Sequence, residues 1–296
     1  MEDKMNEQLL DRREFGLLCA ALGSSLPAVS AMLTGLSGAS AFAAATSTDS
    51  NVAGRLVKLR GGTVVPALGQ GSWHLGQGRH PAAVEEEALR TGLSLGMTLI
   101  DTAEGYGNGR SEELIGRAIA GQRDRVFLVS KVDHMTADGI IARACEESLA
   151  RLGTDHLDLY LAHWRDRSTD LSVLVTAFES LRTAGKIRAW GVSNFSINDM
   201  EELFNIRHGD RCATNQVLYN LGDRSIERDL LPWCERHSMP VMAYSPLGGL
   251  GASLLGDPIL GRIAAAHACS AAAVALAWTI RSVTSSQFPN PGPWHM

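Results

Sequence analysis

The chain has 296 residues, of which 45% are hydrophobic and 20% are charged, as is usual for a globular protein with a large core. Its formal net charge is −5, so it lacks the excess of basic residues that binding to nucleic acid or to an anionic membrane surface requires. We therefore expect no nucleic-acid partner.

The first 45 residues resemble a twin-arginine export signal. Arg12 and Arg13 are followed by Phe15 and a weakly apolar run, and Ala41-Phe42-Ala43 fits a small-x-small cleavage site. A membrane anchor is the alternative, but glycines, serines and a proline interrupt the run, so we expect no stable membrane span. We predict a signal peptide over residues 1–45, export by the twin-arginine machinery and a periplasmic location, or a cytoplasmic one if the signal is not used.

A polar linker is predicted over residues 46–55, and a β-hairpin follows it. Two short apolar runs, Leu56–Leu59 and Thr63–Val65, flank the turn residues Arg60-Gly61-Gly62. We expect this hairpin to close one end of the fold that comes after it.

From residue 67 onward, apolar strand segments alternate with amphipathic helical segments. The predicted strands are Ala67–Gly71, Thr98–Asp101, Val126–Lys131, Leu157–His163, Ala189–Ser193, Ala213–Val217 and Val241–Ser245. The predicted helices are Pro81–Leu95, Ser111–Ala120, Ala137–Leu152, Leu171–Ala184, Ile197–Ile206, Arg228–His237 and Ala271–Ile280.

This alternation predicts an α/β fold with a parallel sheet, because the strands are continuous apolar runs, as expected of strands covered on both faces. A doubly wound sheet that binds a dinucleotide would carry GxGxxG after its first strand, and Gly69, Gly71 and Gly76 do not fit that spacing. We therefore predict a (β/α)8 TIM barrel over residues 56–296. Cleavage of the leader would leave a chain close to the ~250 residues typical of this fold.

Four ionisable residues fall at the carboxyl ends of neighbouring predicted strands. Asp101, Lys131 and His163 end the second, third and fourth strands, and Tyr106 lies in the loop after the second. Active sites of such barrels form on this face. Each residue alone also fits a structural role in a turn cap, a solvated strand end or the core. Their shared position favours a catalytic group.

These residue types suit proton donation to a carbonyl group. A free tyrosine has a pKa of about 10, and we expect the Lys131 ammonium to lower the pKa of Tyr106 toward neutrality. Asp101 would hold Lys131, and His163 would hydrogen-bond the carbonyl oxygen. No nucleophile paired with a base and no metal-binding set is visible, so a cofactor is expected to supply hydride. An aldolase that uses Lys131 as a Schiff base is the alternative chemistry.

The motifs around these residues are similar to those of the aldo-keto reductase family. The resemblance runs from about Leu68 to Trp278. It includes Asp101–Gly107, Lys131, Leu161–Trp164, Gly185–Arg188, Trp190–Phe195, Asn215–Val217 and Ala243–Gly248. It implies an oxidoreductase with Asp101, Tyr106, Lys131 and His163 as its catalytic tetrad and Tyr106 as the general acid.

The resemblance also implies a nicotinamide cofactor, NADPH with NADH possible. It assigns Ser193, Asn194 and Gln216 to the nicotinamide carboxamide, Tyr244 to stacking on the nicotinamide ring, and Ser245 and Leu247 to the pyrophosphate. For Ser193 and Asn194, a helix N-cap is the competing interpretation.

The substrate implied by the resemblance is a small aldehyde or ketone, since the chain looks similar to bacterial reductases of small aldehydes such as methylglyoxal. Trp73 and Trp164 are expected to form walls of the substrate pocket, with core packing as the alternative.

The family pattern breaks after Arg281. Three prolines, Pro289, Pro291 and Pro293, oppose a strand or helix there, so the eighth strand-helix unit is expected to be missing or degenerate, with Val283–Gln287 as a short remnant strand. Residues 282–296 do not show the residues with which the family grips the 2′-phosphate. Weak cofactor affinity is therefore expected, and a non-catalytic nucleotide- or partner-binding barrel is the alternative function.

Overall fold

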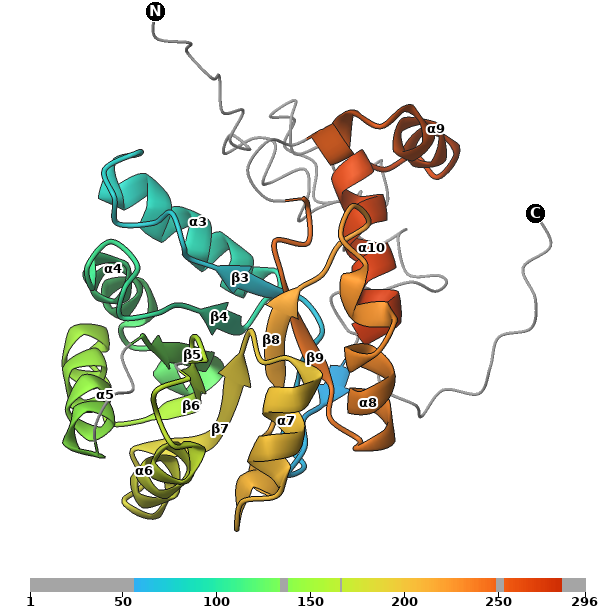
Figure 1. The fold of residues 1–296 in the computed structure, drawn as a ribbon. Helices are drawn as coiled ribbons and strands as arrows, with labels where there is room; N and C mark the ends of the chain where they lie inside the picture. Colours follow the sequence, from blue (N-terminus) through green and yellow to red (C-terminus); the bar gives the residue numbers. More distant parts are fainter. Residues whose placement is uncertain (1–55, 134–137, 166, 249–252, 284–296) are drawn as a thin grey trace, which may run out of the picture.

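The computed structural model describes residues 56–133, 138–165, 167–248 and 253–283 (Figure 1). The predicted signal peptide (1–45), the linker (46–55) and residues 284–296 of the divergent end lie outside the described residues, so these predictions stay predictions.

Seven parallel strands form one sheet, in which each strand pairs with the next one along the chain. They are β3 (Gly69–Gly71), β4 (Leu99–Asp101), β5 (Phe127–Val132), β6 (Leu157–Ala162), β7 (Ile187–Ser193), β8 (Asn215–Leu218) and β9 (Val241–Tyr244). The sheet curves into a nearly closed barrel with the helices outside it (Figure 1). The predicted barrel class is confirmed.

The helices around the barrel are α3 (Ala82–Ser94), α4 (Arg110–Ile119), α5 (Asp138–Leu152), α6 (Leu171–Thr183), α7 (Ile197–Phe204), α8 (Leu230–Arg236), α9 (Pro258–Ala266) and α10 (Ala271–Val283). Helix α9 was not among the predicted elements. Asp257 caps its N-terminus, since the Asp257 carboxylate accepts a hydrogen bond from the backbone N–H of Ile259. Pro258 is the first residue of the helix.

Several strand limits differ from those predicted. Strand β5 continues one residue past Lys131, since Val132 still pairs with Ala162 of β6. Strand β6 ends at Ala162, so His163 is the first residue beyond it. Val283, the first residue of the predicted remnant strand, is instead the last residue of α10, and the other residues of that prediction lie outside the described residues.

Alternate residues of each strand face two different cores, as the period of two in a β-strand requires. On β4, β5 and β6, Ile100, Leu128 and Tyr160 pack against the surrounding helices, whereas the adjacent inward residues Leu99, Val129 and Leu159 fill the barrel. The next inward positions toward the carboxyl ends of β4 and β5 are Asp101 and Lys131. The barrel interior therefore changes from apolar to ionisable at its carboxyl mouth.

The predicted hairpin is present and closes the opposite end of the barrel. Strands β1 (Leu56–Lys58) and β2 (Val64–Pro66) are antiparallel. The buried residues Val57, Leu59 and Val65 belong to the same interior cluster as Leu99 and Val129. An apolar plug at this end confines polar chemistry to the other one.

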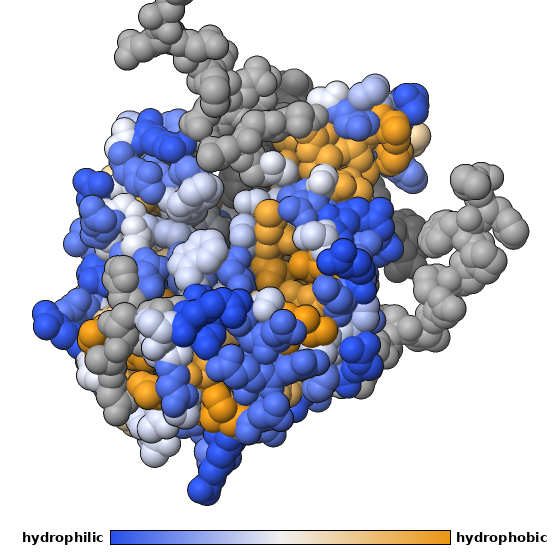
Figure 2. Space-filling model, viewed as in Figure 1, coloured by the Kyte–Doolittle hydropathy of each residue, from blue (hydrophilic) through white to orange (hydrophobic). Residues whose placement is uncertain are grey.

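No single helix in the described ranges is long and apolar enough to cross a membrane; α9 and α10 reach that criterion only as a pair, with a bend of 92° between them. Apolar side chains lie exposed on α9, among them Ile259 and Ile263 (Figure 2).

An ionic cluster joins α6 to β7. Glu179, whose side chain is 14% exposed, accepts hydrogen bonds from Nε1 of Trp190 at 2.8 Å, from Arg182 at 2.8 Å and from Arg211. Burial would raise the pKa of Glu179, but these three donors outweigh it and lower the pKa to about 2. The ionised carboxylate is therefore the form that the fold stabilises.

We expect Glu179→Gln to lower the free energy of unfolding at pH 7 by about 1–3 kcal/mol, the range for hydrogen bonds to charged groups. Because the folded-state pKa lies below the unfolded value of about 4.5, this contribution is complete above pH 4.5 and declines as the pH falls toward 2. Urea denaturation at pH 7 and at acid pH measures the difference. Glu201→Gln, at an exposed site on α7, is the control. An equal loss at both pH values would contradict the ionic role.

Candidate active site

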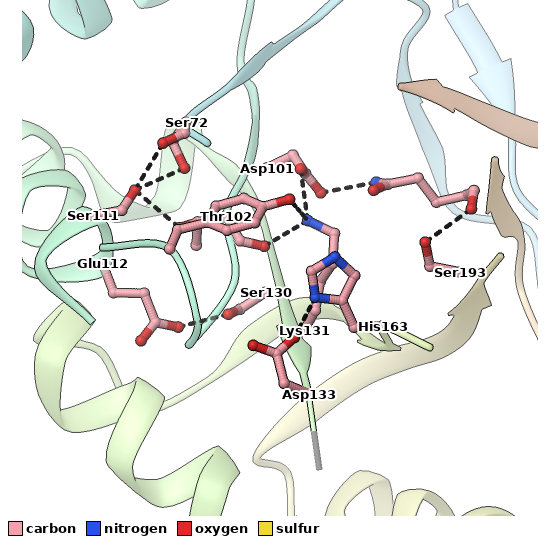
Figure 3. Close-up of polar contacts among 12 residues, drawn as sticks. Ser72, Asp101, Thr102, Ser111, Glu112, Ser130, Lys131, Asp133, His163 and Ser193 are labelled. Atoms are coloured by element: carbon pink, nitrogen blue, oxygen red, sulfur yellow. Dashed lines mark hydrogen bonds and ion pairs between the residues drawn. The ribbon is translucent and has the colours of Figure 1, made fainter. Parts of the chain in front are cut away.

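Inward-facing residues of β4 and β5 bring the predicted catalytic side chains together at the carboxyl mouth of the barrel (Figure 3). Lys131 is fully buried, and its Nζ lies 2.7 Å from Oδ2 of Asp101 and 2.8 Å from the carbonyl oxygen of Thr102. The same nitrogen lies 3.2 Å from the hydroxyl of Tyr106. The ammonium therefore has three oxygen partners, one of which is the predicted acid.

The pKa shifts in this group differ in part from those expected. Burial raises the pKa of the Tyr106 phenol, and the Lys131 ammonium offsets only part of that effect. The prediction that Lys131 brings the pKa of Tyr106 below its usual value is thus wrong, because burial of the phenol is the larger effect. Tyr106 is a protonated phenol at neutral pH, which is the form that donates a proton.

Lys131 itself is cationic. Burial acts to lower its pKa, but Asp101 and Tyr106 outweigh this and raise the pKa above the usual value. A Schiff-base lysine needs an unprotonated nitrogen that substrate can reach, and this one is fully buried and charged. The geometry therefore argues against the aldolase alternative.

His163 directly follows β6, the strand that pairs with β5, which carries Lys131. Its backbone N–H donates to the carbonyl oxygen of Val132 at 3.0 Å, and its ring lies edge-on to that of Tyr106, with 5.8 Å between the centroids. Its Nδ1 is hydrogen-bonded to Oδ1 of Asp133, the first residue beyond β5 and two residues after Lys131. The four predicted catalytic residues are thus brought together, with Asp133 as a fifth.

A carboxylate on the outer side of β5 fixes the strand that carries Lys131. Ser130 donates to Oε1 of Glu112 at 2.6 Å (Figure 3). Nε of Arg151 lies 2.6 Å from Oε2 of the same glutamate. Glu112 is fully buried. Because it joins α4, β5 and α5, the backbone at Lys131 has little freedom to shift.

Buried hydroxyl groups hold the loop that carries Tyr106. Oγ of Ser111 donates to Oγ of Ser72 at 2.9 Å and lies 3.3 Å from Oγ1 of Thr102 (Figure 3). The backbone N–H of Ser111 donates to the carbonyl oxygen of Tyr106 at 3.3 Å. The loops after β3 and β4 are therefore tied together on either side of the phenol.

The predicted carboxamide-binding residues lie beside this group, at the ends of β7 and β8. Ser193 is paired with Gln216 in the sheet register, and both are buried. Nε2 of Gln216 donates to Oδ1 of Asp101 at 2.8 Å, and Nδ2 of Asn194 donates to the carbonyl oxygen of His163 at 3.1 Å. The side-chain amides of Gln216 and Asn194 therefore link the predicted cofactor-binding residues to the predicted catalytic residues.

Tyr244, at the end of β9, donates from its hydroxyl to Oδ1 of Asn194 at 3.0 Å. The N-cap interpretation of Asn194 is wrong, since Ser196 caps α7 in a capping box with Asp199. Asn194 instead has a φ of 59°, a left-handed conformation that asparagine tolerates better than most residues. Its side chain thereby reaches back toward the barrel mouth.

The last two predicted cofactor residues, Ser245 and Leu247, follow β9 in a turn. The carbonyl oxygen of Ser245 accepts the backbone N–H of Gly248 at 3.0 Å and the side-chain amide of Asn220 at 3.0 Å. Leu247 packs against the cluster formed by Leu68, Met97 and the apolar side chains of α10. Both residues are therefore at the carboxyl end of β9, on the same face as the catalytic group.

Trp73 and Trp164 are 49% and 54% exposed, so the core-packing alternative is wrong for both. Trp164 stacks on His163, with centroids 5.4 Å apart. Trp73 stacks on His74 at 4.3 Å. The exposed indole ring of Trp164, next to the predicted catalytic residue His163, suits the wall of a substrate pocket.

Comparison with known proteins identifies the family of this site. The model of the aldo/keto reductase family matches residues 67–292. The chain belongs to the aldo/keto reductase family. As a member of it, the chain is an oxidoreductase that acts on carbonyl compounds.

Curated relatives of this aldo/keto reductase include bacterial enzymes. Methylglyoxal reductase YeaE of Escherichia coli (strain K12) is 51% identical over 230 residues, which are 76% of this chain and 81% of that protein. Aldo-keto reductase YhdN of Bacillus subtilis (strain 168) is 38% identical over 194 residues, which are 61% of this chain and 58% of that protein.

Solved structures of the family have the same fold as this aldo/keto reductase. An aldo/keto reductase from Klebsiella pneumoniae, crystallised with NADP and acetate, matches with a TM-score of 0.73 and 48% identity over 76% of this chain and 81% of that one. A second structure from the same organism, in complex with NADPH, matches with a TM-score of 0.74 over 77% and 81%.

Asp133 and the Gln216–Asp101 bond of this aldo/keto reductase are absent from the sequence-based predictions. The alternation of β5 carries a signal for Asp133, since it follows Lys131 by two residues and so belongs to the same face. The Gln216–Asp101 bond joins positions 115 residues apart across the barrel, and no local pattern reports such a contact.

Proposed function

We propose that this family member reduces small aldehydes and ketones to alcohols with NADPH and that Tyr106 is the general acid. The observation that carries the proposal is the contact of Lys131 Nζ with both the Tyr106 hydroxyl and the Asp101 carboxylate. The names of two relatives, methylglyoxal reductases of Escherichia coli at 51% and 31% identity, support a small carbonyl substrate.

The residues present fit a nicotinamide cofactor. Gln216 and Asn194 place side-chain amides at the mouth, and Tyr244 places a half-buried aromatic ring beside them. A carboxamide needs both donors and acceptors, and an amide side chain offers both. Ser193, Asn194 and Gln216 would hold the carboxamide, Tyr244 the ring, and Ser245 and Leu247 the pyrophosphate. Bound NADPH supplies a hydride to the carbonyl carbon.

The chain's own residues supply the proton. As negative charge develops on the carbonyl oxygen, the Tyr106 hydroxyl donates its proton to that oxygen. The phenolate that remains is stabilised by the Lys131 ammonium, whose charge is balanced in turn by Asp101. His163 orients the carbonyl oxygen, and Trp73 and Trp164 flank the substrate and limit the access of water.

Export of the folded protein is part of this proposal. It is supported by Arg12-Arg13, by the apolar run that follows and by Ala41-Phe42-Ala43 in the sequence. A periplasmic reductase would need its cofactor loaded before export, which is the situation that twin-arginine translocation serves.

The test is to purify the full chain and follow NADPH oxidation with methylglyoxal and with a panel of small aldehydes, comparing NADH at the same concentrations. We expect turnover that depends on the carbonyl substrate and is faster with NADPH. A folded protein that binds NADPH without any turnover would contradict the proposal and favour a non-catalytic nucleotide-binding barrel.

A further inference from the structure

We propose that Asp133 is a positioning residue of the reduction: its carboxylate accepts a hydrogen bond from Nδ1–H of His163 and so aims Nε2 at the substrate carbonyl. This inference rests on the proposed function. It adds a fifth side chain to the four predicted catalytic residues, at the first position beyond the strand that carries Lys131.

The geometry of Asp133 suits an acceptor held in one place. Oδ1 contacts Nδ1 of His163, and the two side chains are only 22% and 14% exposed. The backbone N–H of Asp133 donates to Oε1 of Glu104 at 2.7 Å. The main chain of His163 is fixed as well, by its hydrogen bond to Val132. Both partners of the Asp133–His163 bond are therefore anchored through their backbones.

Gly105 makes the space that Asp133 occupies. A Cβ at residue 105 would lie 2.0 Å from Oδ2 of Asp133 and 3.1 Å from its Cγ. Since these atoms end a flexible side chain, an alanine at Gly105 would turn the carboxylate away rather than disrupt the backbone. The absence of a side chain at Gly105, in the loop that carries Tyr106, therefore allows Asp133 to contact His163.

The bond to Asp133 decides what Nε2 of His163 can do. Without a partner at Nδ1, a neutral imidazole can carry its proton on either nitrogen and the ring can turn over. With the proton held on Nδ1, Nε2 lies on the side of the Lys131 ammonium (Figure 3). In this orientation Nε2 is the ring nitrogen that can hydrogen-bond the substrate oxygen, both before and after that oxygen takes its proton from Tyr106. One orientation serves both substrate and product.

The effect of losing this bond is expected at the chemical step. For Asp133→Ala we expect kcat/KM for methylglyoxal to fall about 10- to 100-fold, the range found when carboxylate partners of metal-bound histidines are removed. The fall should lie mainly in kcat, with the Kd for NADPH unchanged. Asp133→Asn keeps a side-chain oxygen that can accept from Nδ1, so we expect it to retain most of the activity. Asp124→Asn, at an exposed site before β5, is the control.

Nitrogen-15 NMR of labelled protein reads the tautomer directly, with the His163 signal assigned from its absence in His163→Gln. We expect a proton on Nδ1 in the wild type and in Asp133→Asn, and a different tautomer in Asp133→Ala. Gly105→Ala should reproduce the Asp133→Ala spectrum and kinetics, and the double variant should be no worse than Asp133→Ala alone.

The outcomes separate this inference from the proposed function. If the wild type oxidises no NADPH, the proposed function is overturned. The tautomer of His163, read by NMR, still shows in that case whether Asp133 holds the proton on Nδ1. An active wild type overturns the role of Asp133 if Asp133→Ala keeps the wild-type tautomer and kcat/KM, or if the effects of Gly105→Ala and Asp133→Ala add.

Discussion

Replacing Tyr106 by phenylalanine is expected to lower kcat for the reduction of methylglyoxal by on the order of 10²–10⁴, the usual contribution of a positioned general acid. The change removes the hydroxyl that lies 3.2 Å from Lys131 Nζ and leaves the ring in place. Since burial keeps the pKa of this phenol above its usual value, Tyr106 is protonated at neutral pH, and no other described phenol contacts the ammonium. Stopped-flow or steady-state NADPH oxidation measures the loss, and fluorescence titration should give an unchanged Kd for NADPH.

The chain offers a matched control in Tyr160. This tyrosine is fully buried on β6 and faces the helices, and its hydroxyl has no hydrogen-bond partner among the described residues. Tyr160→Phe therefore removes the same atom from a site where it makes no bond, and we expect near-normal kcat. Activity of Tyr106→Phe within tenfold of wild type would contradict the role of Tyr106 as the acid.

Much of this site can be predicted from the sequence because it depends on local order. Once strands alternate with helices, successive strands are neighbours, and polar residues at strand ends meet on one face. That reasoning places Asp101, Lys131 and His163 together although strand limits shift by a residue. It succeeds for the hairpin too, where the turn glycines and flanking apolar residues specify the pairing without distant contacts.

Two kinds of feature escape such reasoning. The direction of the pKa shift of Tyr106 depends on the balance between burial of the phenol and the charge of Lys131. The order of the strands predicts that Lys131 is nearby, but it does not predict how deeply the phenol is buried. Helix α9 is short and contains Gly261, so its helical pattern is weak, although Asp257 and Pro258 form a recognisable start. The error on the pKa of Tyr106 arises from its tertiary environment. Helix α9 was missed because its apolar segment is short and hides the local start signal.

The conversion of Lys131 to methionine should damage both catalysis and stability, and the two effects can be separated. Methionine keeps the buried volume but removes the cation, so the Asp101 carboxylate loses its partner at 2.7 Å and Tyr106 loses the charge that stabilises its phenolate. Breaking a buried ion pair costs 3–5 kcal/mol. Because Asp101 is 17% exposed and keeps its bond from Gln216, we expect a loss of about 3 kcal/mol, with kcat lower by at least on the order of 10²-fold.

A second change tells these effects apart. In Lys131→Met with Asp101→Asn, the unpaired charge is gone, and the asparagine still offers Gln216 an acceptor. The free energy of unfolding, measured by urea denaturation, should therefore recover toward the wild-type value, whereas kcat should stay as low as in Lys131→Met. If stability did not recover, the cost of Lys131→Met would lie in packing rather than in the uncompensated carboxylate. If kcat recovered, the ammonium would not be what stabilises the Tyr106 phenolate. We expect stability to recover without activity. That result would mean that Asp101 chiefly balances the charge of Lys131 and that Lys131 stabilises the Tyr106 phenolate.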